Sequence, residues 1–279
     1  MLKHTFCHIP GIGEKREQFL WSLGIASWEA VFTTYSLHIP PPVQELLNKK
    51  VEESFYHYRH RNVGYFIEQL ESKHHWRLYR DFRDSCAFLD IETTGLFPPN
   101  KITTIALYDG RDIRVYIRGI NLDRFIRDLQ DYSLLITYNG KSFDVPLIKA
   151  HFGINLATAH VDLRYFLQSL GYRGGLKQCL HRIGLRWPLL EDVSGPIAAY
   201  LWEEYRKGKN PKALETLLAY NVHDVIALNY LTVHVYNEKL KSTPFQDILS
   251  LGAPLNPLVP YQPDRATLER IRRRALTLS

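Results

Sequence analysis

The sequence has few cysteines and no long apolar run. Its three cysteines, Cys7, Cys86 and Cys179, are widely spaced and never form a C-x-x-C pair, so neither a disulfide framework nor a zinc knuckle is predicted. No stretch approaches the ~18 consecutive apolar residues that a transmembrane helix needs. His, Pro and Lys interrupt the first residues before a signal-peptide core could form. We therefore expect a soluble chain that is not exported, has no membrane partner and works in the reducing cytoplasm.

The sequence also lacks the composition of a disordered chain. Of its 279 residues, 45% are hydrophobic and 13% aromatic, and the 23% that are charged include both signs. Such a chain can bury a substantial core. Lys and Arg outnumber Asp and Glu by 35 to 29, a net charge of +6, which is a mild bias toward polyanionic partners and identifies none of them.

Helical patterns dominate the first 83 residues. Residues 1–37 contain a Pro-Gly-Ile-Gly turn that leads into a helix closed near Gly24. In residues 38–83, a run of three prolines predicts a stiff connection into a helix near residues 43–53. Residues 54–83 then mix aromatic side chains with basic ones and histidines. They could stack nucleic-acid bases, but packing in a core is the commoner role of such rings.

Residues 84–240 change to a mixed pattern of strands and helices. Three β-rich runs come first, and a helix, a strand, a second helix and a short strand follow in the order βββαβαβ. Further helices complete the region. This order predicts an α/β domain, in which helices flank a mixed β-sheet, preceded by a small helical N-terminal region. Residues 241–279 are predicted to be a Pro-rich, basic tail that ends in a basic helix. The basic side chains of such a helix more often form a solvated face than bind nucleic acid.

Acidic residues at three places could carry chemistry. Side chains alternate across a strand, so Asp90 and Glu92 point to one face. Paired carboxylates suit Mg²⁺ or Mn²⁺, although two such residues at a strand end can also be merely solvated. Asp144 follows the fourth strand at a helix start, where an acid is often only a cap. Tyr220 and Asp224 lie at i and i+4 on one face of an apolar helix, where a buried carboxylate needs a partner.

Together these segments resemble the DEDD superfamily of 3′→5′ exonucleases, the DnaQ-like branch of the ribonuclease H fold. The resemblance covers residues 84–240 and rests on three motifs in order: FLDIETTGL, YNGKSFDVPLI and YNVHD. The chain is most similar to the YprB-type ribonuclease-H-like exonuclease group, which also carries a segment similar to residues 4–35. Ala219 stands where the DEDDh branch has His, so the resemblance favours the DEDDy type. In that type, Tyr220 would take the role that involves the attacking water and its base.

The resemblance implies a metal-dependent 3′→5′ exonuclease with two Mg²⁺ or Mn²⁺ ions per site. Asp90, Glu92 and Asp224 would hold one ion, while Asp90 bridges to a second whose water shell Asp144 fixes. Tyr220 would orient the attacking water or accept its proton indirectly, since a phenol is a poor base unless a metal first acidifies the water. The catalytic set is thus Asp90, Glu92, Asp144, Tyr220 and Asp224, and its four carboxylates are the metal ligands. The expected substrate is nucleic acid, with single-stranded DNA favoured and RNA open; protein partners remain unknown.

Residues beside the motifs are expected to contact the nucleic acid. In residues 1–37, which resemble a helix-hairpin-helix, backbone amides and two cations could receive a phosphate, although an ordinary helical corner would show the same pattern. A ribonuclease or a structure-specific endonuclease on the same fold is an alternative, as is a non-catalytic nucleic-acid-binding protein. The expected contacts are Thr93, Thr94, Gly95 and Leu96 after the first motif, Asn139 and Phe143 in the second, and Gly11, Gly13, Lys15 and Arg16 near the N-terminus.

Overall fold

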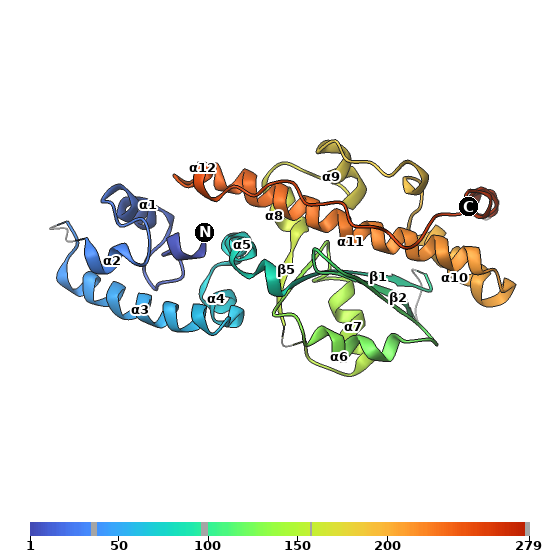
Figure 1. Cartoon of the computed structure of the whole chain (residues 1–279), viewed down its shortest axis with the longest axis horizontal. Helices are drawn as coiled ribbons and strands as arrows, with labels where there is room; N and C mark the ends of the chain where they lie inside the picture. The colour runs from blue at the N-terminus through green and yellow to red at the C-terminus, as the bar shows by residue number, and fades with distance from the viewer. Residues whose placement is uncertain (35–37, 96–99, 157, 277–279) are drawn as a thin grey trace. The chain divides into compact units, whose positions relative to one another are not determined.

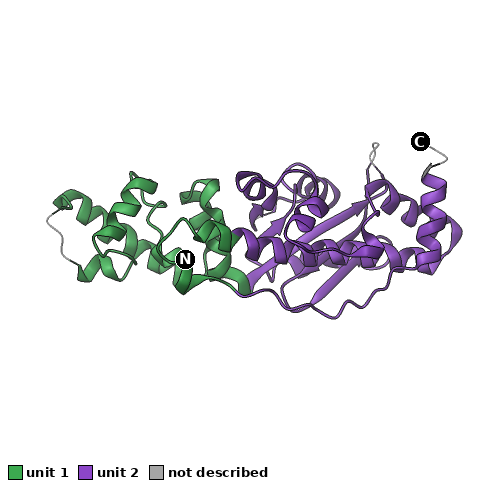
Figure 2. Ribbon diagram, turned by 90° about the horizontal axis from the view of Figure 1, so that it is seen from above, with its two compact units in different colours: residues 1–84, 236–251 green, residues 85–235, 252–279 purple. Residues whose placement is uncertain are grey.

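The computed structural model describes residues 1–34, 38–95, 100–156 and 158–276. The chain forms two compact units, shown in Figure 2. Unit 1 contains Met1–Asp84 and Tyr236–Leu251, and unit 2 contains Ser85–Val235 and Gly252–Ser279. Each unit is described by itself below. The finer boundaries at residues 37 and 83 stay predictions.

Unit 1 is helical and has an aromatic core. Trp28, Phe66 and Phe82 are fully buried, and the rings of Trp28 and Phe66 stack with centroids 5.9 Å apart. Core packing is therefore the role of Phe66 and Phe82 in the aromatic-basic stretch. The helices of this unit are η1 (Leu2–His4), α1 (Glu14–Ser22), α2 (Ala30–Thr33), α3 (Pro41–Arg59), α4 (Val63–Gln69), η2 (Ser72–Leu78), α5 (Tyr79–Phe82) and α12 (Gln246–Leu249).

The proline run forms the first turn of a helix, whereas the sequence analysis predicted that it would be a connection ahead of the helix. Helix α3 starts at Pro41, with Pro42 also in its first turn. The first N–H groups of a helix have no intrahelical acceptor, so prolines cost little there, and their fixed φ suits the helix. The helix consequently extends over Pro41–Arg59, beyond the predicted residues 43–53 at both ends.

Unit 2 is built around a five-stranded mixed sheet, which confirms the predicted α/β class. The strand order is β3-β2-β1-β4-β5. The pairs β1–β2 and β2–β3 are antiparallel, and the pairs β1–β4 and β4–β5 are parallel. The central strand β1 is thus neighboured on both sides, and it is the strand that carries the first motif. The strands are β1 (Cys86–Thr93), β2 (Ile102–Tyr108), β3 (Ile113–Ile117), β4 (Leu134–Thr137) and β5 (Ala159–Asp162).

Helices cover both faces of the sheet (Figure 1). On one face, Leu89 and Ile91 of β1 pack with Phe125 of α6 and Ile148 of α7; α11 lies on the other. The predicted order of strands and helices is confirmed. The remaining helical segments are η3 (Arg83–Ser85), η4 (Leu122–Arg124), α6 (Phe125–Leu129), α7 (Asp144–Phe152), α8 (Leu163–Ser169), α9 (Leu176–Arg182), η5 (Pro188–Leu190), α10 (Gly195–Gly208), α11 (Pro211–Leu240) and α13 (Arg265–Leu276).

Three of these helices form a second apolar core in unit 2. Leu201 of α10, Leu217 of α11 and Leu268 of α13 are buried in one cluster. Because α13 packs there, the end of the predicted tail is a docked helix. Among the helices of the described residues, none combines the length and apolar character needed to cross a membrane.

Candidate metal centre

Three carboxylates meet where β1 faces α11. The alternation of β1 places Leu89 and Ile91 in the core on one side of the sheet, so Asp90 and Glu92 face the other. There, one carboxylate oxygen from each of Asp90, Glu92 and Asp224 lies within 4.8 Å of the others. The structure therefore brings together residues that are more than 130 positions apart in the sequence.

Asn221, one turn before Asp224, holds Asp90 in place. Its amide nitrogen donates to Oδ2 of Asp90 at 2.7 Å and to the carbonyl oxygen of Asp90 at 3.2 Å. Its amide oxygen accepts from the Thr104 hydroxyl of β2 at 3.0 Å. Asn221 is fully buried, so this one side chain ties α11 to two neighbouring strands. The motif YNVHD contains Asn221, but nothing in its spacing shows which residue the amide contacts.

Burial and mutual repulsion make the three charges costly. The pKa values of Asp90 and Glu92 are raised well above their ordinary values, first by burial and then by the charges of Asp224 and Asp144. Burial raises the pKa of Asp224 to about 6, against the charge of Lys177 and a hydrogen bond from Tyr220. A divalent cation among these oxygens would relieve the repulsion, and hard oxygen ligands suit such an ion. The donor set fits a divalent metal.

Asp144 lies beside this cluster and outside it. It opens α7 and is buried, and burial raises its pKa to about 7 although the backbone amide of Ile91 hydrogen-bonds it. That contact places the Asp144 carboxylate against β1 at Ile91, the residue between Asp90 and Glu92. Its charge also acts on both of them. Asp144 is thus near enough to contribute to a metal site without sharing the three-carboxylate cluster.

The turn before Asp144 is fixed by a residue that the sequence analysis did not single out. Asp162, the last residue of β5, accepts from the backbone N–H groups of Asn139 at 2.8 Å and of Lys141 and Arg164 at 3.1 Å. Gly140 is needed in this turn because a Cβ there would lie 2.2 Å from Oγ1 of Thr137. A buried carboxylate with three amide donors is a strong local anchor.

Tyr220 is a hydrogen-bond donor to the cluster. Its hydroxyl bonds the carboxylate of Asp224, as expected for residues one turn apart on a helix. Burial and the charges of Asp224, Glu92 and Asp90 raise the pKa of Tyr220 well above its ordinary value. The phenol therefore stays protonated, and the residue can orient a partner but cannot act as a free base.

Lys177 of α9 brings a positive charge to this side of the site, which the sequence analysis missed. Its ammonium donates to the carbonyl oxygens of Leu190 at 2.7 Å and Glu191 at 3.1 Å, and to that of Val193. It lies 4.8 Å from the ring centroid of Tyr220. Burial lowers its pKa, while the charges of Asp224 and Glu92 oppose that shift. The only available signal was a single lysine in a helical pattern, which does not reveal such a position.

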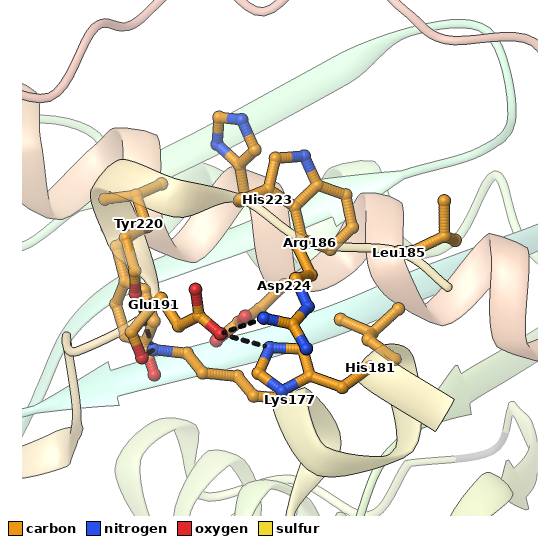
Figure 3. Close-up of a pocket in the computed structure, with 11 residues that line it drawn as sticks. Lys177, His181, Leu185, Arg186, Glu191, Tyr220, His223 and Asp224 are labelled. Atoms are coloured by element: carbon orange, nitrogen blue, oxygen red, sulfur yellow. Dashed lines mark hydrogen bonds and ion pairs between the residues drawn. The ribbon is translucent and has the colours of Figure 1, made fainter. Parts of the chain in front are cut away.

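A small pocket of about 20 Å³ opens beside Asp224 (Figure 3). Figure 3 shows Lys177 and Tyr220 at one side of it, and the carboxylate of Glu191 joined by dashed lines to both His181 and Arg186. Nε2 of His181 lies 2.8 Å from Oε1 of Glu191, and Nη1 of Arg186 lies 3.8 Å from the same oxygen. This ion pairing joins α9 to the segment whose carbonyl groups hold Lys177.

The predicted contacts after the first motif lie at the end of β1. Thr93 is buried, and its hydroxyl donates to the carbonyl oxygen of Gly95 at 3.2 Å. The exposed Thr94 accepts from the backbone N–H of Lys101 at 3.2 Å. Leu96 lies outside the described residues. The structure thus places three of these four residues in one turn, directly after Glu92.

Asn139 and Phe143 have roles within the fold. Asn139 has a left-handed backbone with φ of 63°, and its side-chain oxygen accepts from Arg164 and from the Ser142 hydroxyl. Phe143 is half-buried and packs against the core cluster under the sheet. The contact of either residue with nucleic acid stays a prediction.

The four N-terminal residues lie together in unit 1. Gly11 has φ of 80°, Gly13 caps α1 in an extended conformation, and Lys15 and Arg16 are exposed in the first turn. Nη1 of Arg16 donates to the carbonyl oxygen of Gly11. The same turn also carries two acids, Glu14 and Glu17.

Comparisons with known proteins place the centre in a family. The model of the RNase_H superfamily matches residues 87–236, which contain all the residues of the centre; this match indicates a nuclease. The uncharacterized protein YprB of Bacillus subtilis is 28% identical over 193 residues, covering 58% of this chain and 44% of that protein. The family B DNA polymerase of Pyrobaculum calidifontis has 14% identity and a TM-score of 0.41, covering 60% of this chain and 27% of that one.

Proposed function

Because the chain belongs to the RNase_H superfamily, we propose that it is a metal-dependent 3′→5′ exonuclease of the DEDDy type, which hydrolyses phosphodiester bonds of nucleic acid. The observation that carries the proposal is the cluster of Asp90, Glu92 and Asp224, with Asp144 beside it and Tyr220 bonded to Asp224. The chain spans less than half the length of the curated relative that it matches.

The four carboxylates would hold divalent cations, Mg²⁺ or Mn²⁺. Asp90, Glu92 and Asp224 would bind one ion, and Asp144 would contribute to a second together with Asp90. Bound at such a site, two ions acidify the attacking water and stabilise the charge on the leaving 3′ oxygen.

The remaining residues of the centre would orient the carboxylates and the attacking water, and would offset the negative charge of the carboxylates. Asn221 keeps the Asp90 carboxylate turned toward α11, and Tyr220 donates its proton to a hydrogen bond on Asp224. A protonated phenol next to the carboxylates can align a water for in-line attack without removing its proton. The ammonium of Lys177 stands near enough to Asp224 and Glu92 to offset negative charge, and it can attract a phosphate.

Single-stranded DNA is the proposed substrate, with RNA as the second candidate, and we propose that the protein acts in the cytoplasm. A non-catalytic nucleic-acid-binding protein on the same fold would have no need for a complete set of acids. The presence of all four, two of them on a buried strand face, therefore favours catalysis. The resemblance of residues 1–37 to a helix-hairpin-helix supports a separate grip on phosphate by Gly11, Gly13, Lys15 and Arg16.

A time course on end-labelled substrates tests this function. Single-stranded DNA, blunt duplex DNA and single-stranded RNA, each labelled at the 5′ end, are incubated with the protein in Mg²⁺ or Mn²⁺. The proposal predicts a ladder that shortens one nucleotide at a time from the 3′ end. Asp90→Ala should abolish it, because the substitution removes a carboxylate from the cluster. Asp112→Ala, which removes an exposed acid from the turn between β2 and β3, is the matched control.

The outcomes separate the alternatives. Internal cuts without a ladder would identify an endonuclease, and cleavage of RNA alone would identify a ribonuclease. Full activity of Asp90→Ala, or undiminished activity in excess chelator, would refute the metal centre as the catalytic site. Binding without any cleavage in either metal would favour the non-catalytic alternative.

A further inference from the structure

Helix α8 carries an exposed aromatic ring in unit 2. Its residues Leu163, Phe166 and Leu167 are buried, whereas Tyr165 between them is 54% exposed. Within the described part of the chain, the hydroxyl of Tyr165 has no hydrogen-bond partner. About half of this ring is therefore open to solvent, and an aromatic face open to solvent is available for a planar ligand to stack on.

A cation accompanies this ring. The ammonium of Lys141, in the turn before α7, lies 5.5 Å from the centroid of the Tyr165 ring. That distance is within the range of a cation–π contact. Lys141 is itself exposed and forms no ion pair with the described residues. We call these two side chains the Lys141–Tyr165 platform.

The backbone under the platform is fixed. The carboxylate of Asp162 accepts from the backbone N–H of Lys141 and from that of Arg164, the neighbour of Tyr165. The guanidinium of Arg164 also donates to the side chain of Asn139 in the same turn. Two of these hydrogen bonds, Lys141 to Asp162 and Arg164 to Asn139, join the two segments that carry the platform, so the backbones under the ring and the cation are placed side by side before any ligand arrives. Such pre-organisation lowers the entropy cost of binding.

Lys141 of the platform lies on the turn that leads to Asp144. Lys141 precedes Asp144 by three residues, and the carboxylate of Asp144 bonds the backbone of β1 at Ile91. The turn that carries Lys141 therefore leads directly into the acidic residue that lies beside the carboxylate cluster.

An exposed ring beside a cation has the chemistry to bind an unpaired nucleotide. Every base can stack on an aromatic face, and an ammonium next to the ring can meet the phosphate. Bases in a duplex are already stacked and paired, and are not available to such a ring. Resting on the proposed function, we propose that the Lys141–Tyr165 platform binds an unpaired nucleotide of a single-stranded substrate whose end occupies the metal centre.

Binding measurements test the platform apart from catalysis. Fluorescence anisotropy with a labelled single-stranded oligothymidylate and with a blunt duplex is recorded in Ca²⁺, for the wild type, Tyr165→Ala, Tyr165→Leu and Tyr165→Phe. Loss of one stacked base should weaken single-strand binding roughly 5- to 150-fold in the Ala and Leu variants, and leave duplex binding unchanged. The Phe variant keeps the ring and should bind like the wild type. The Leu variant keeps an apolar side chain, so it separates stacking from simple contact.

Matched controls exclude a general effect of losing an exposed apolar side chain or a charge. Ile120→Ala removes an apolar side chain that is 61% exposed after β3 of unit 2, and should not change binding. Lys141→Gln should lower the slope of log affinity against log salt by about 0.7 for a single strand. Lys149→Gln, at an exposed position near the end of α7, should leave that slope unchanged.

The result that overturns the platform differs from the one that overturns the function. If the wild type degrades single strands but Tyr165→Ala and Tyr165→Leu bind them as tightly as the wild type, the platform is wrong and the function stands. An equal loss in Ile120→Ala, or an equal loss of duplex binding, also contradicts it. If the wild type neither binds nor cleaves nucleic acid, the proposed function fails, and the platform fails with it.

Discussion

Replacing one carboxylate of the metal centre should stabilise the metal-free protein. Burial raises the pKa of Asp224 from 3.8 to about 6, so above that pH the folded state holds a charge that the unfolded chain carries more easily. A difference of about two pKa units at about 1.4 kcal/mol each gives roughly 3 kcal/mol. Asp224→Asn keeps the shape and removes the charge, but it weakens the contacts with Tyr220 and Lys177. We expect a net gain of about 1–3 kcal/mol in the free energy of unfolding.

The sign of the pH dependence follows from the direction of the shift. Because the folded pKa is raised, the folded state binds more protons than the unfolded chain between about pH 4 and 6, and this group's contribution to stability is lost as the pH rises through that window. The advantage of Asp224→Asn should therefore be large at pH 8 and should shrink toward pH 4. At pH 8 the gain corresponds to a rise in Tm of about 2–10 °C.

The assay is thermal unfolding of both proteins in chelator at pH 8 and pH 5, followed by circular dichroism. Asp112→Asn, a change at an exposed position in the β2–β3 turn, is the control and should leave Tm nearly unchanged. Adding Mn²⁺ should raise the Tm of the wild type more than that of Asp224→Asn, because the variant has lost a ligand. A variant that is less stable than the wild type at pH 8 in chelator would refute the argument that repulsion dominates this cluster.

Two further predictions concern the proposed reaction and the proposed grip. Tyr220→Phe keeps the packing of the ring and removes the hydrogen bond to Asp224, so the attacking water loses its alignment. Single-turnover cleavage should slow by roughly 10²-fold with little change in affinity; lost affinity with an unchanged rate would make Tyr220 a packing residue. Replacing Lys15 and Arg16 by Ala should flatten the salt dependence of binding by a slope of about one per lost phosphate contact, with turnover at saturating substrate preserved. A salt titration of binding in Ca²⁺ and a cleavage assay in Mn²⁺ test the Lys15 and Arg16 variant. An unchanged slope of log affinity against log salt would mean that residues 1–37 only support the fold, and loss of the cleavage rate at saturating substrate would place them in the catalytic centre.

The parts of the centre that could be predicted from sequence obey local periodicity. The period of two in a strand places Asp90 and Glu92 on one face, and the period of 3.6 in a helix places Tyr220 above Asp224. Both rules act within a few residues, so they hold without knowledge of the fold. The order of strands and helices in unit 2 was predictable for the same reason.

The supporting contacts were not predictable, because they join distant segments. Asn221 bonds Asp90 across 131 positions of sequence, and Lys177 approaches the centre only because three carbonyl groups of the segment after α9 hold its ammonium. Asp162 anchors the turn at Asn139 across 23 positions. An amide, a lysine and an acid at these places look like ordinary surface residues until the sheet brings the segments together.

The balance of charge at the centre explains why binding of substrate should depend on the metal. Four carboxylates and the single ammonium of Lys177 give a formal charge of −3 when all are ionised, which repels phosphate at close range. Two divalent ions would change this to +1. The net charge of the whole chain, +6, is spread over its surface and is screened by salt beyond about 10 Å. It cannot offset the repulsion at the reacting phosphate, so in chelator a substrate could be held only by contacts outside the centre, such as the Lys141–Tyr165 platform.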